Sequence, residues 1–280
     1  MLTIAGYNNL SKIHEGEVSN VYRAGRMSDN QSVILKVLNN SYSHLIERKR
    51  YKQNYIISCT LDTDNVVRTF GLEEHQSQMV MILEDFGGES LEKLINTQHA
   101  FTIDELLIYT IRITEILGSI HGQNIIHKDI NPSNIILNPA SGVIKIAGFG
   151  ICTQLSKQHI SLKNTGVLEG TLAYMSPEQT GRMNRDLDYR SDFYSLGATF
   201  YELFTGVVPF VTTDALEIVH CHIAKQPTPP IQINPDLPAT VSNIILKLLE
   251  KTAEGRYQSA WGLKVDLEQC LKQWQKTGKI

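Results

Sequence analysis

The sequence predicts an α+β protein with a small strand-rich N-terminal lobe, residues 1–86, and a larger helical C-terminal lobe, residues 87–280. Three observations support this prediction. Short β-branched or apolar runs separated by turn residues occupy much of the first third of the chain. The glycine pair Gly87-Gly88 follows these runs and indicates a hinge. Beyond this pair, apolar residues recur with the period of an amphipathic helix.

Within the N-terminal lobe we expect strands at residues 18–24, 33–38 and 79–83. Each run is short, apolar or β-branched, and bounded by turn residues. Residues 44–59 break this pattern, because they are highly charged at first and then apolar. They predict the one helix of this lobe.

The C-terminal lobe has clearer helix signals. Thr102 and Glu105 have the spacing of a capping box, and the apolar stripe after them ends at His121-Gly122. A small hairpin is expected at residues 135–137 and 143–146. His220 and His222, two apart on a predicted helix, point to different faces, so we expect them at the surface rather than on a shared metal. The further helices are expected at residues 191–204, 215–224, 241–250 and 260–274.

Composition excludes several classes of protein. The chain has 280 residues, 42% of them hydrophobic, and its 26 basic and 29 acidic residues give a net charge of −3. A basic excess typical of nucleic-acid binding is missing. No apolar run has the length of a membrane span, and no signal peptide is visible. The four cysteines are scattered, which favours neither a zinc site nor disulfides, and we expect a cytoplasmic protein.

The segment 127–134, His-Lys-Asp-Ile-Asn-Pro-Ser-Asn, carries the strongest chemical signal. It lies between a predicted helix and the hairpin. The carboxylate of Asp129 can accept a proton from a hydroxyl group, and the amide oxygen of Asn134 can bind a metal ion. The alternative is that both residues only shape a turn, and the segment taken alone favours that alternative.

Other segments add to this one in a fixed order. They are Lys36 within a strand, residues 145–150 (KIAGFG), residues 170–178 (GTLAYMSPE) and residues 192–197 (DFYSLG). Together they match the protein-kinase signature set across nearly the whole chain. The sequence resembles the Ser/Thr protein kinase family, and most of all the kinase domains that open large bacterial multidomain sensor proteins. The resemblance implies a two-lobed kinase fold with an ATP-type pocket between the lobes.

The resemblance also implies residue roles. Lys36 would bind the α and β phosphates of ATP, Asp129 would be the catalytic base, and Asn134 would bind Mg²⁺. Thr171 would belong to a Ser/Thr-type substrate loop, and Asp192 would brace the catalytic loop. Glu178 would pair with Arg256. Nucleotide contacts would come from Ile13, Gly16, Val21, Leu83, Glu84 and Phe86.

Lys128, next to the expected base, implies control by phosphorylation of the activation loop. The candidate hydroxyls are those of Thr153, Ser156, Ser161 and Thr165. Any polar loop contains such residues, so their presence is equally consistent with an ordinary loop.

Three single positions and the glycine-rich loop depart from the family pattern. Gly148 stands where the metal-binding Asp of D-F-G is expected, and glycine offers no side-chain ligand. Asn54 stands where a helix Glu should pair with Lys36, and Asn131 replaces a phosphate-contacting Lys. The glycine-rich loop carries His14 and Ser19 at glycine positions, with Glu15 and Glu17 adding negative charge.

These departures leave three hypotheses. The favoured one is a regulatory pseudokinase that binds a nucleotide weakly, with or without Mg²⁺, and transmits signals to domains beyond Ile280. The second is an active Ser/Thr protein kinase with Asp129 as the base and Asn134 as its metal anchor. A small-molecule kinase of related fold is the third and is disfavoured by residues 170–178 and 192–197. The protein partner or substrate is not identified by the sequence.

Overall fold

The computed structural model describes residues 3–16, 18–39, 45–61, 63–75, 78–154, 169–182 and 185–278. The chain divides into two compact units. The first comprises Met1–Gly88 and Asn138–Gly150, and the second comprises Glu89–Leu137 and Ile151–Ile280. The sequence prediction assigned residues 138–150 to the C-terminal lobe, whereas by contacts they group with the first unit. A β-sheet in the first unit and helices in the second confirm the α+β class.

The sheet of the first unit is antiparallel, with strand order β1-β2-β3-β5-β4. The predicted strands correspond to β2, β3 and β5. The two edge strands, β1 and β4, were not predicted, because most of their side chains are partly or fully exposed and polar residues obscure the apolar alternation. The strands are β1 (Tyr7–Glu15), β2 (Ser19–Arg26), β3 (Ser32–Leu38), β4 (Thr69–His75) and β5 (Gln78–Glu84).

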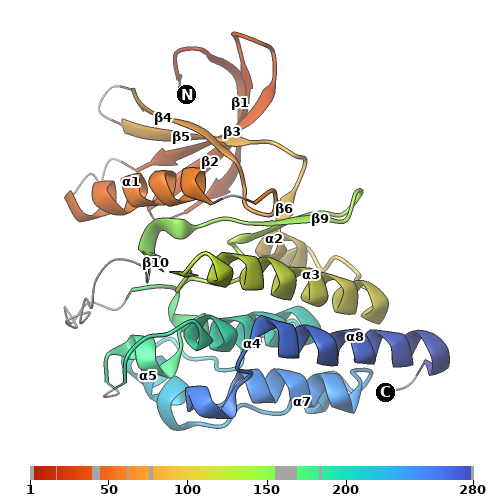
Figure 1. Cartoon of the computed structure of the whole chain (residues 1–280). Helices are drawn as coiled ribbons and strands as arrows, with labels where there is room; N and C mark the ends of the chain where they lie inside the picture. The colour runs from red at the N-terminus through yellow and green to blue at the C-terminus, as the bar shows by residue number, and fades with distance from the viewer. Residues whose placement is uncertain are drawn as a thin grey trace. The chain divides into compact units, whose positions relative to one another are not determined.

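Helix α1 (Leu45–Thr60) confirms the one predicted helix of this unit and packs beside the sheet (Figure 1). Its Tyr51 is buried with Leu38, Met79 and Met81, and the Tyr51 hydroxyl donates to the carbonyl of Lys36 on β3. Burial of these apolar side chains holds α1 against the sheet.

Strand β9 (Val143–Ile146) also belongs to the first unit. The Ile146 carbonyl accepts the Val67 N–H at 3.0 Å, and the Ile146 N–H donates to the Asn65 carbonyl at 2.9 Å. These two bonds tie residues 138–150 to the chain ahead of β4, which explains why this late segment groups with the N-terminal sheet.

The second unit is mostly helical. Its helices are α2 (Leu91–Asn96), α3 (Ile103–Gly122), α4 (Arg190–Thr205), α5 (Ala215–Ala224), α6 (Pro230–Ile233), α7 (Ala239–Leu248) and α8 (Ala260–Thr277). The predicted helices correspond to α3, α4, α5, α7 and α8, and the two short ones were missed. The 3-10 turns within the described ranges are η2 (Phe149–Ile151), η3 (Leu172–Tyr174), η4 (Pro177–Thr180) and η5 (Ala253–Gly255). None of the helices in the described ranges is long and apolar enough to cross a bilayer.

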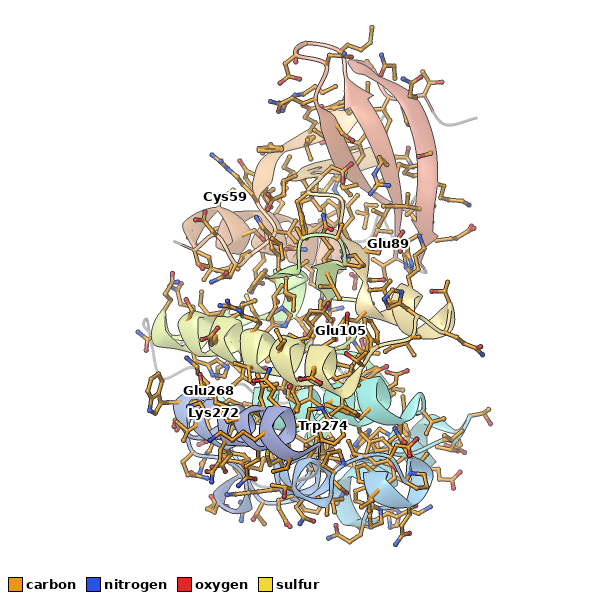
Figure 2. All side chains as sticks on the ribbon, turned by 90° about the vertical axis from the view of Figure 1, so that its right-hand side faces the viewer. Cys59, Glu89, Glu105, Glu268, Lys272 and Trp274 are labelled. Carbon is orange, nitrogen blue, oxygen red and sulfur yellow. The ribbon has the colours of Figure 1, made fainter. Side chains whose placement is uncertain are left out.

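Helices α3 and α8 run side by side (Figure 1). Thr102 and Glu105 form the predicted capping box at the start of α3. The indole N–H of Trp274 on α8 donates to Asp104 at 2.8 Å, so this start is also tied to the last helix (Figure 2).

Short strands frame the loops that carry the chemistry. The turn between β8 and β9 is closed by the Gly142 N–H, which donates to the Asn138 carbonyl at 2.8 Å. In the second unit β6 (Glu89–Ser90) pairs with β8 (Ile135–Asn138), and β7 (Ile125–Ile126) pairs with β10 (Thr153–Gln154). Residues 127–134 are therefore held between β7 and β8.

Candidate functional site

The loop of residues 127–134 is shaped by Asp192 on α4. One carboxylate oxygen of Asp192 accepts the His127 N–H and lies 2.8 Å from His121 Nε2, and the other accepts the Lys128 N–H at 2.7 Å. Burial would raise the pKa of this fully buried carboxyl, but the hydrogen bonds and charges of His121 and His127 hold the pKa below its ordinary value. Asp192 therefore remains ionised and anchors the loop.

The carboxylate of Asp129 is oriented from three sides. Its Oδ1 accepts the Thr171 hydroxyl at 2.8 Å, the Thr171 N–H at 3.1 Å and Asn131 Nδ2 at 2.9 Å. Its Oδ2 accepts Asn134 Nδ2 at 3.0 Å. A carboxylate held this firmly can receive a proton from a hydroxyl placed against it. The structure thus brings Asp129, Asn134 and Thr171 together.

Asn131 serves this geometry. It is buried, and its Nδ2 bonds the Asp129 carbonyl, the Asp129 carboxylate and the Thr171 hydroxyl. Its Oδ1 accepts the Ser133 N–H and hydroxyl. The amide therefore braces the loop internally.

In the first unit, the segment after β9 is held by α1. The Phe149 N–H donates to Asn54 Oδ1 at 3.2 Å, and Ser58 Oγ donates to the same oxygen at 3.2 Å. Asn54 is buried. Its uncharged amide occupies the position where the resemblance implies a Glu. Gly148, one residue earlier, has a φ of +94°, a conformation that suits glycine.

The glycine-rich loop between β1 and β2 is closed on itself. The Gly16 N–H donates to the Ser19 carbonyl at 3.2 Å, and the Gly16 carbonyl accepts Asn39 Nδ2 at 2.9 Å. A Cβ at Gly16 would lie 2.8 Å from the Ser19 carbonyl oxygen, so only glycine fits. Ile13 lies on β1, Val21 on β2 pairs with Lys36 on β3, and Glu17 lies outside the described residues.

The side chains at the end of β5 are used by the fold. Glu84 accepts Lys145 Nζ at 2.6 Å and the Arg68 N–H at 2.6 Å, and Lys145 also lies over the Phe86 ring at 5.4 Å. Leu83 packs against the cluster around Tyr51. The Glu84 side chain is therefore ion-paired within the first unit, and its contact with a nucleotide stays a prediction.

Asp85 is fixed as well. It accepts Ser32 Oγ at 2.6 Å and Arg23 Nε at 2.7 Å. Burial acts to raise the pKa of Asp85, but these two hydrogen bonds lower the pKa below its ordinary value. Asp85-Phe86-Gly87 spells D-F-G, yet it lies at the end of β5 and its carboxylate is committed to Arg23.

Glu178 and Arg256 form a buried pair in the second unit. Arg256 donates to both carboxylate oxygens, at 2.6 and 2.9 Å, and Ser191 Oγ adds a third bond to Glu178 at 2.7 Å. Burial acts to raise the pKa of Glu178, but Arg256 holds the pKa below its usual range. The structure brings these two predicted residues together.

The candidate phosphorylation sites are only partly described. Thr153 lies on β10, opposite Ile126 of β7. Ser156, Ser161 and Thr165 lie outside the described residues. Lys128 itself is buried, and its Nζ lies 3.3 Å from Glu169 Oε2, a residue that the sequence analysis did not single out. A pair separated by 41 residues leaves no pattern in the local sequence.

The expectation that His222 lies at the surface was wrong. His222 is buried beside η3, with Nδ1 2.9 Å from the Tyr194 hydroxyl and Nε2 2.8 Å from the Leu172 carbonyl. The face of α5 that carries His222 is buried, whereas His220 on the same helix is exposed. His222 therefore supports the residue that follows Thr171.

His222 predicts an acid-sensitive stability. Burial, and to a smaller extent Lys251, lower the pKa of His222 to about 4 from an ordinary 6.5. Between pH 4 and pH 6.5 the unfolded chain therefore binds more protons at His222 than the folded chain does. The contribution of neutral His222 to the free energy of unfolding is complete above pH 6.5 and is lost as the pH falls to 4. The loss amounts to about 3 kcal/mol. Urea unfolding at several pH values measures how steeply the free energy of unfolding falls between pH 6.5 and pH 4. This pH dependence should be weaker in His222→Gln and unchanged in His220→Gln.

Comparison with known proteins decides the family. The model for the protein kinase domain matches residues 7–272. The chain belongs to the protein kinase family. This kinase domain is 31% identical over 267 residues to a probable serine/threonine-protein kinase of Clostridium perfringens, covering 95% of the chain and 38% of that relative. It is 31% identical over 265 residues to the serine/threonine-protein kinase PrkC of Bacillus subtilis, covering 94% and 40%.

A third relative is a much longer protein than the two bacterial kinases. Hybrid signal transduction histidine kinase G of Dictyostelium discoideum is 33% identical over 246 residues, which cover 62% of this chain and 7% of that protein. The kinase domain thus spans about two fifths of the two bacterial relatives and a small part of the third.

The family implies ATP and Mg²⁺, and the residues present fit these two differently. The first unit contains Lys36 and the closed turn at Gly16, two positions at which the resemblance implies nucleotide contacts. Mg²⁺ is usually held by one or two carboxylates together with phosphate oxygens. Here Gly148 offers no side-chain oxygen, Asn134 offers a neutral amide, and the described residues contain no cluster of three His, Cys, Asp or Glu suited to a metal. Gly148 in the first unit and Asn134 in the second unit therefore each lack the carboxylate that usually holds Mg²⁺.

Proposed function

We propose that this kinase-family domain is a regulatory pseudokinase, which binds an adenine nucleotide and whose phosphotransfer is absent or strongly impaired. The observation that carries the proposal is Gly148, which has no side-chain ligand at the D-F-G metal position and a backbone conformation suited to glycine. Phosphoryl transfer depends on positioning and on neutralising phosphate charge. If the missing carboxylate costs about 4 kcal/mol at the transition state, the rate falls about a thousandfold.

Asn54 supports the same proposal. Its amide oxygen binds the Phe149 N–H and Ser58, and it brings no negative charge to Lys36. An amide at this position keeps α1 tied to the segment after β9 without an ion pair. The arrangement maintains the fold while dropping a charge that positions phosphates in the family.

The alternative function is an active Ser/Thr protein kinase that transfers the γ-phosphate of ATP to protein hydroxyls. The observation in its favour is the Asp129 carboxylate, which Thr171, Asn131 and Asn134 orient as a general base requires. In this alternative Asp129 accepts the substrate proton and Asn134 is the remaining metal ligand.

Phosphate incorporation from labelled ATP and Mg²⁺ separates the two functions. The assay compares the parent domain with Asp129→Asn, using a generic protein substrate. A pseudokinase gives parent incorporation equal to that of Asp129→Asn. Incorporation by the parent at the rate of an active kinase, about 1–100 per second, that disappears in Asp129→Asn would establish the active kinase and overturn the proposal.

We further propose that the domain works within a longer signalling protein and passes conformational changes to other domains. The support is that the bacterial relatives extend well beyond the matched region. We place this protein in the cytoplasm, where ATP is available and four free cysteines stay reduced.

A further inference from the structure

Lys128 and Glu169 form a contact that the function above does not use. The side chain of Lys128 is only 7% exposed, and its ammonium nitrogen lies 3.3 Å from the Glu169 carboxylate. An ammonium group buried to this degree requires a negative partner, since desolvation otherwise penalises its charged form. Glu169 is 40% exposed, so the partner reaches in from the surface.

Two residues after Glu169, a second contact joins the same two segments. Thr171 donates its N–H and hydroxyl to Asp129, the neighbour of Lys128. Gly170 lies between them with a φ of +111°, and a Cβ there would lie 3.2 Å from the Lys128 carbonyl. Residues 169 and 171 therefore bind residues 128 and 129 in parallel, through a backbone turn that suits glycine.

Gln179 completes the arrangement. Its Nε2 donates to the Lys128 carbonyl at 2.7 Å, and its Oε1 accepts the Ser176 N–H at 3.1 Å. Lys128 is thus bound at its side chain by Glu169, at its carbonyl by Gln179 and at its N–H by Asp192. All of these partners except Asp192 lie in residues 169–179.

We propose that Glu169 is a positioning residue, whose carboxylate neutralises Lys128 and seats residues 169–174 on the catalytic loop without phosphorylation of the activation loop. From its sequence, Lys128 implied control by phosphorylation of the activation loop. A carboxylate already lies on Lys128, so the seated state is built into the unmodified chain. This inference rests on the proposed function in one respect, namely that Asp129 and Thr171 belong to the functional site of the domain.

Hydrogen exchange at the Thr171 amide tests this proposal, because that amide donates to Asp129 only when the segment is seated. The domain is treated with phosphatase and its unmodified mass is verified. We expect the Thr171 amide to stay protected after this treatment. In Glu169→Gln, which keeps the shape and removes the charge, exchange at Thr171 should rise about tenfold or more.

A double-mutant cycle shows whether Lys128 mediates the effect. In a Lys128→Met background, Glu169→Gln should change exchange at Thr171 no further, because the charge it serves is gone. The matched control is Glu268→Gln on α8 (Figure 2), where Glu268 is 39% exposed and lies 3.5 Å from Lys264. This control should leave Thr171 protected, and α4 amides report that each variant remains folded.

Two results would overturn the proposal. One is a Thr171 amide that loses protection when phosphate is removed from the parent. The other is a folded Glu169→Gln variant whose Thr171 amide exchanges as slowly as in the parent. Neither result depends on phosphotransfer, so a failure here is distinguishable from a failure of the pseudokinase proposal.

Discussion

Replacing Arg256 with alanine is expected to destabilise the second unit by about 3–5 kcal/mol, because it leaves the Glu178 carboxylate buried without its ion partner. The Arg256 side chain is fully buried and, besides Glu178, donates to the carbonyls of Glu250, Lys251 and Arg190. The substitution therefore also removes hydrogen bonds to three backbone carbonyls. Urea unfolding followed by circular dichroism measures the loss.

Arg185→Ala is the control for this prediction. Arg185 also pairs with a glutamate, Glu254, at 2.6 Å, but both side chains are largely exposed. Exposed pairs contribute at most about 1 kcal/mol, so this variant should remain near the parent. Equal stability of the two arginine variants would show that the buried pair is not a structural anchor.

The substitution Gly148→Asp is expected to raise phosphate incorporation by at least tenfold and up to about a thousandfold, since it restores a carboxylate for the metal. Part of the gain is offset by strain, because a side chain at a φ of +94° costs about 1–2 kcal/mol, least for Asp and Asn. Labelled ATP and a generic protein substrate measure the rate.

The variant Gly148→Ala distinguishes the effect of the carboxylate from the effect of backbone strain, because it adds a Cβ without an oxygen. A second control is the Gly148→Asp, Asp129→Asn double variant, which should return to background. If Gly148→Asp is no more active than Gly148→Ala, the missing carboxylate is not what limits this domain.

Local signals in the sequence were sufficient for much of the fold. The capping box of Thr102 and Glu105 and the apolar stripe after it predicted α3, and two apolar runs joined by a loop with Pro139 and Gly142 predicted β8 and β9. The edge strands β1 and β4 escaped, because exposed polar side chains mask their alternation. Their place in the sheet depends on hydrogen bonds to β2 and β5, which a short segment does not encode.

The candidate site was harder to predict where it depends on distant partners. The resemblance supplied Asp129, Asn134 and Thr171, but Glu169 does not stand out by type or spacing. His222 stood out only as a histidine two residues from His220, which gave no sign of its burial. Glu169 matters because Gly170 turns the chain toward Lys128, and His222 matters because α5 buries one of its faces against Tyr194 and Leu172. Tertiary packing creates both roles.

The proposed pseudokinase lacks the carboxylate that would couple Mg²⁺ to the nucleotide. Calorimetric titration of ATP into the parent and into Gly148→Asp, each with and without Mg²⁺, tests it most directly. We predict that Mg²⁺ changes the ATP affinity of the parent by less than about threefold and tightens that of Gly148→Asp by about tenfold or more. A parent whose ATP affinity rises tenfold or more with Mg²⁺ would contradict the claim.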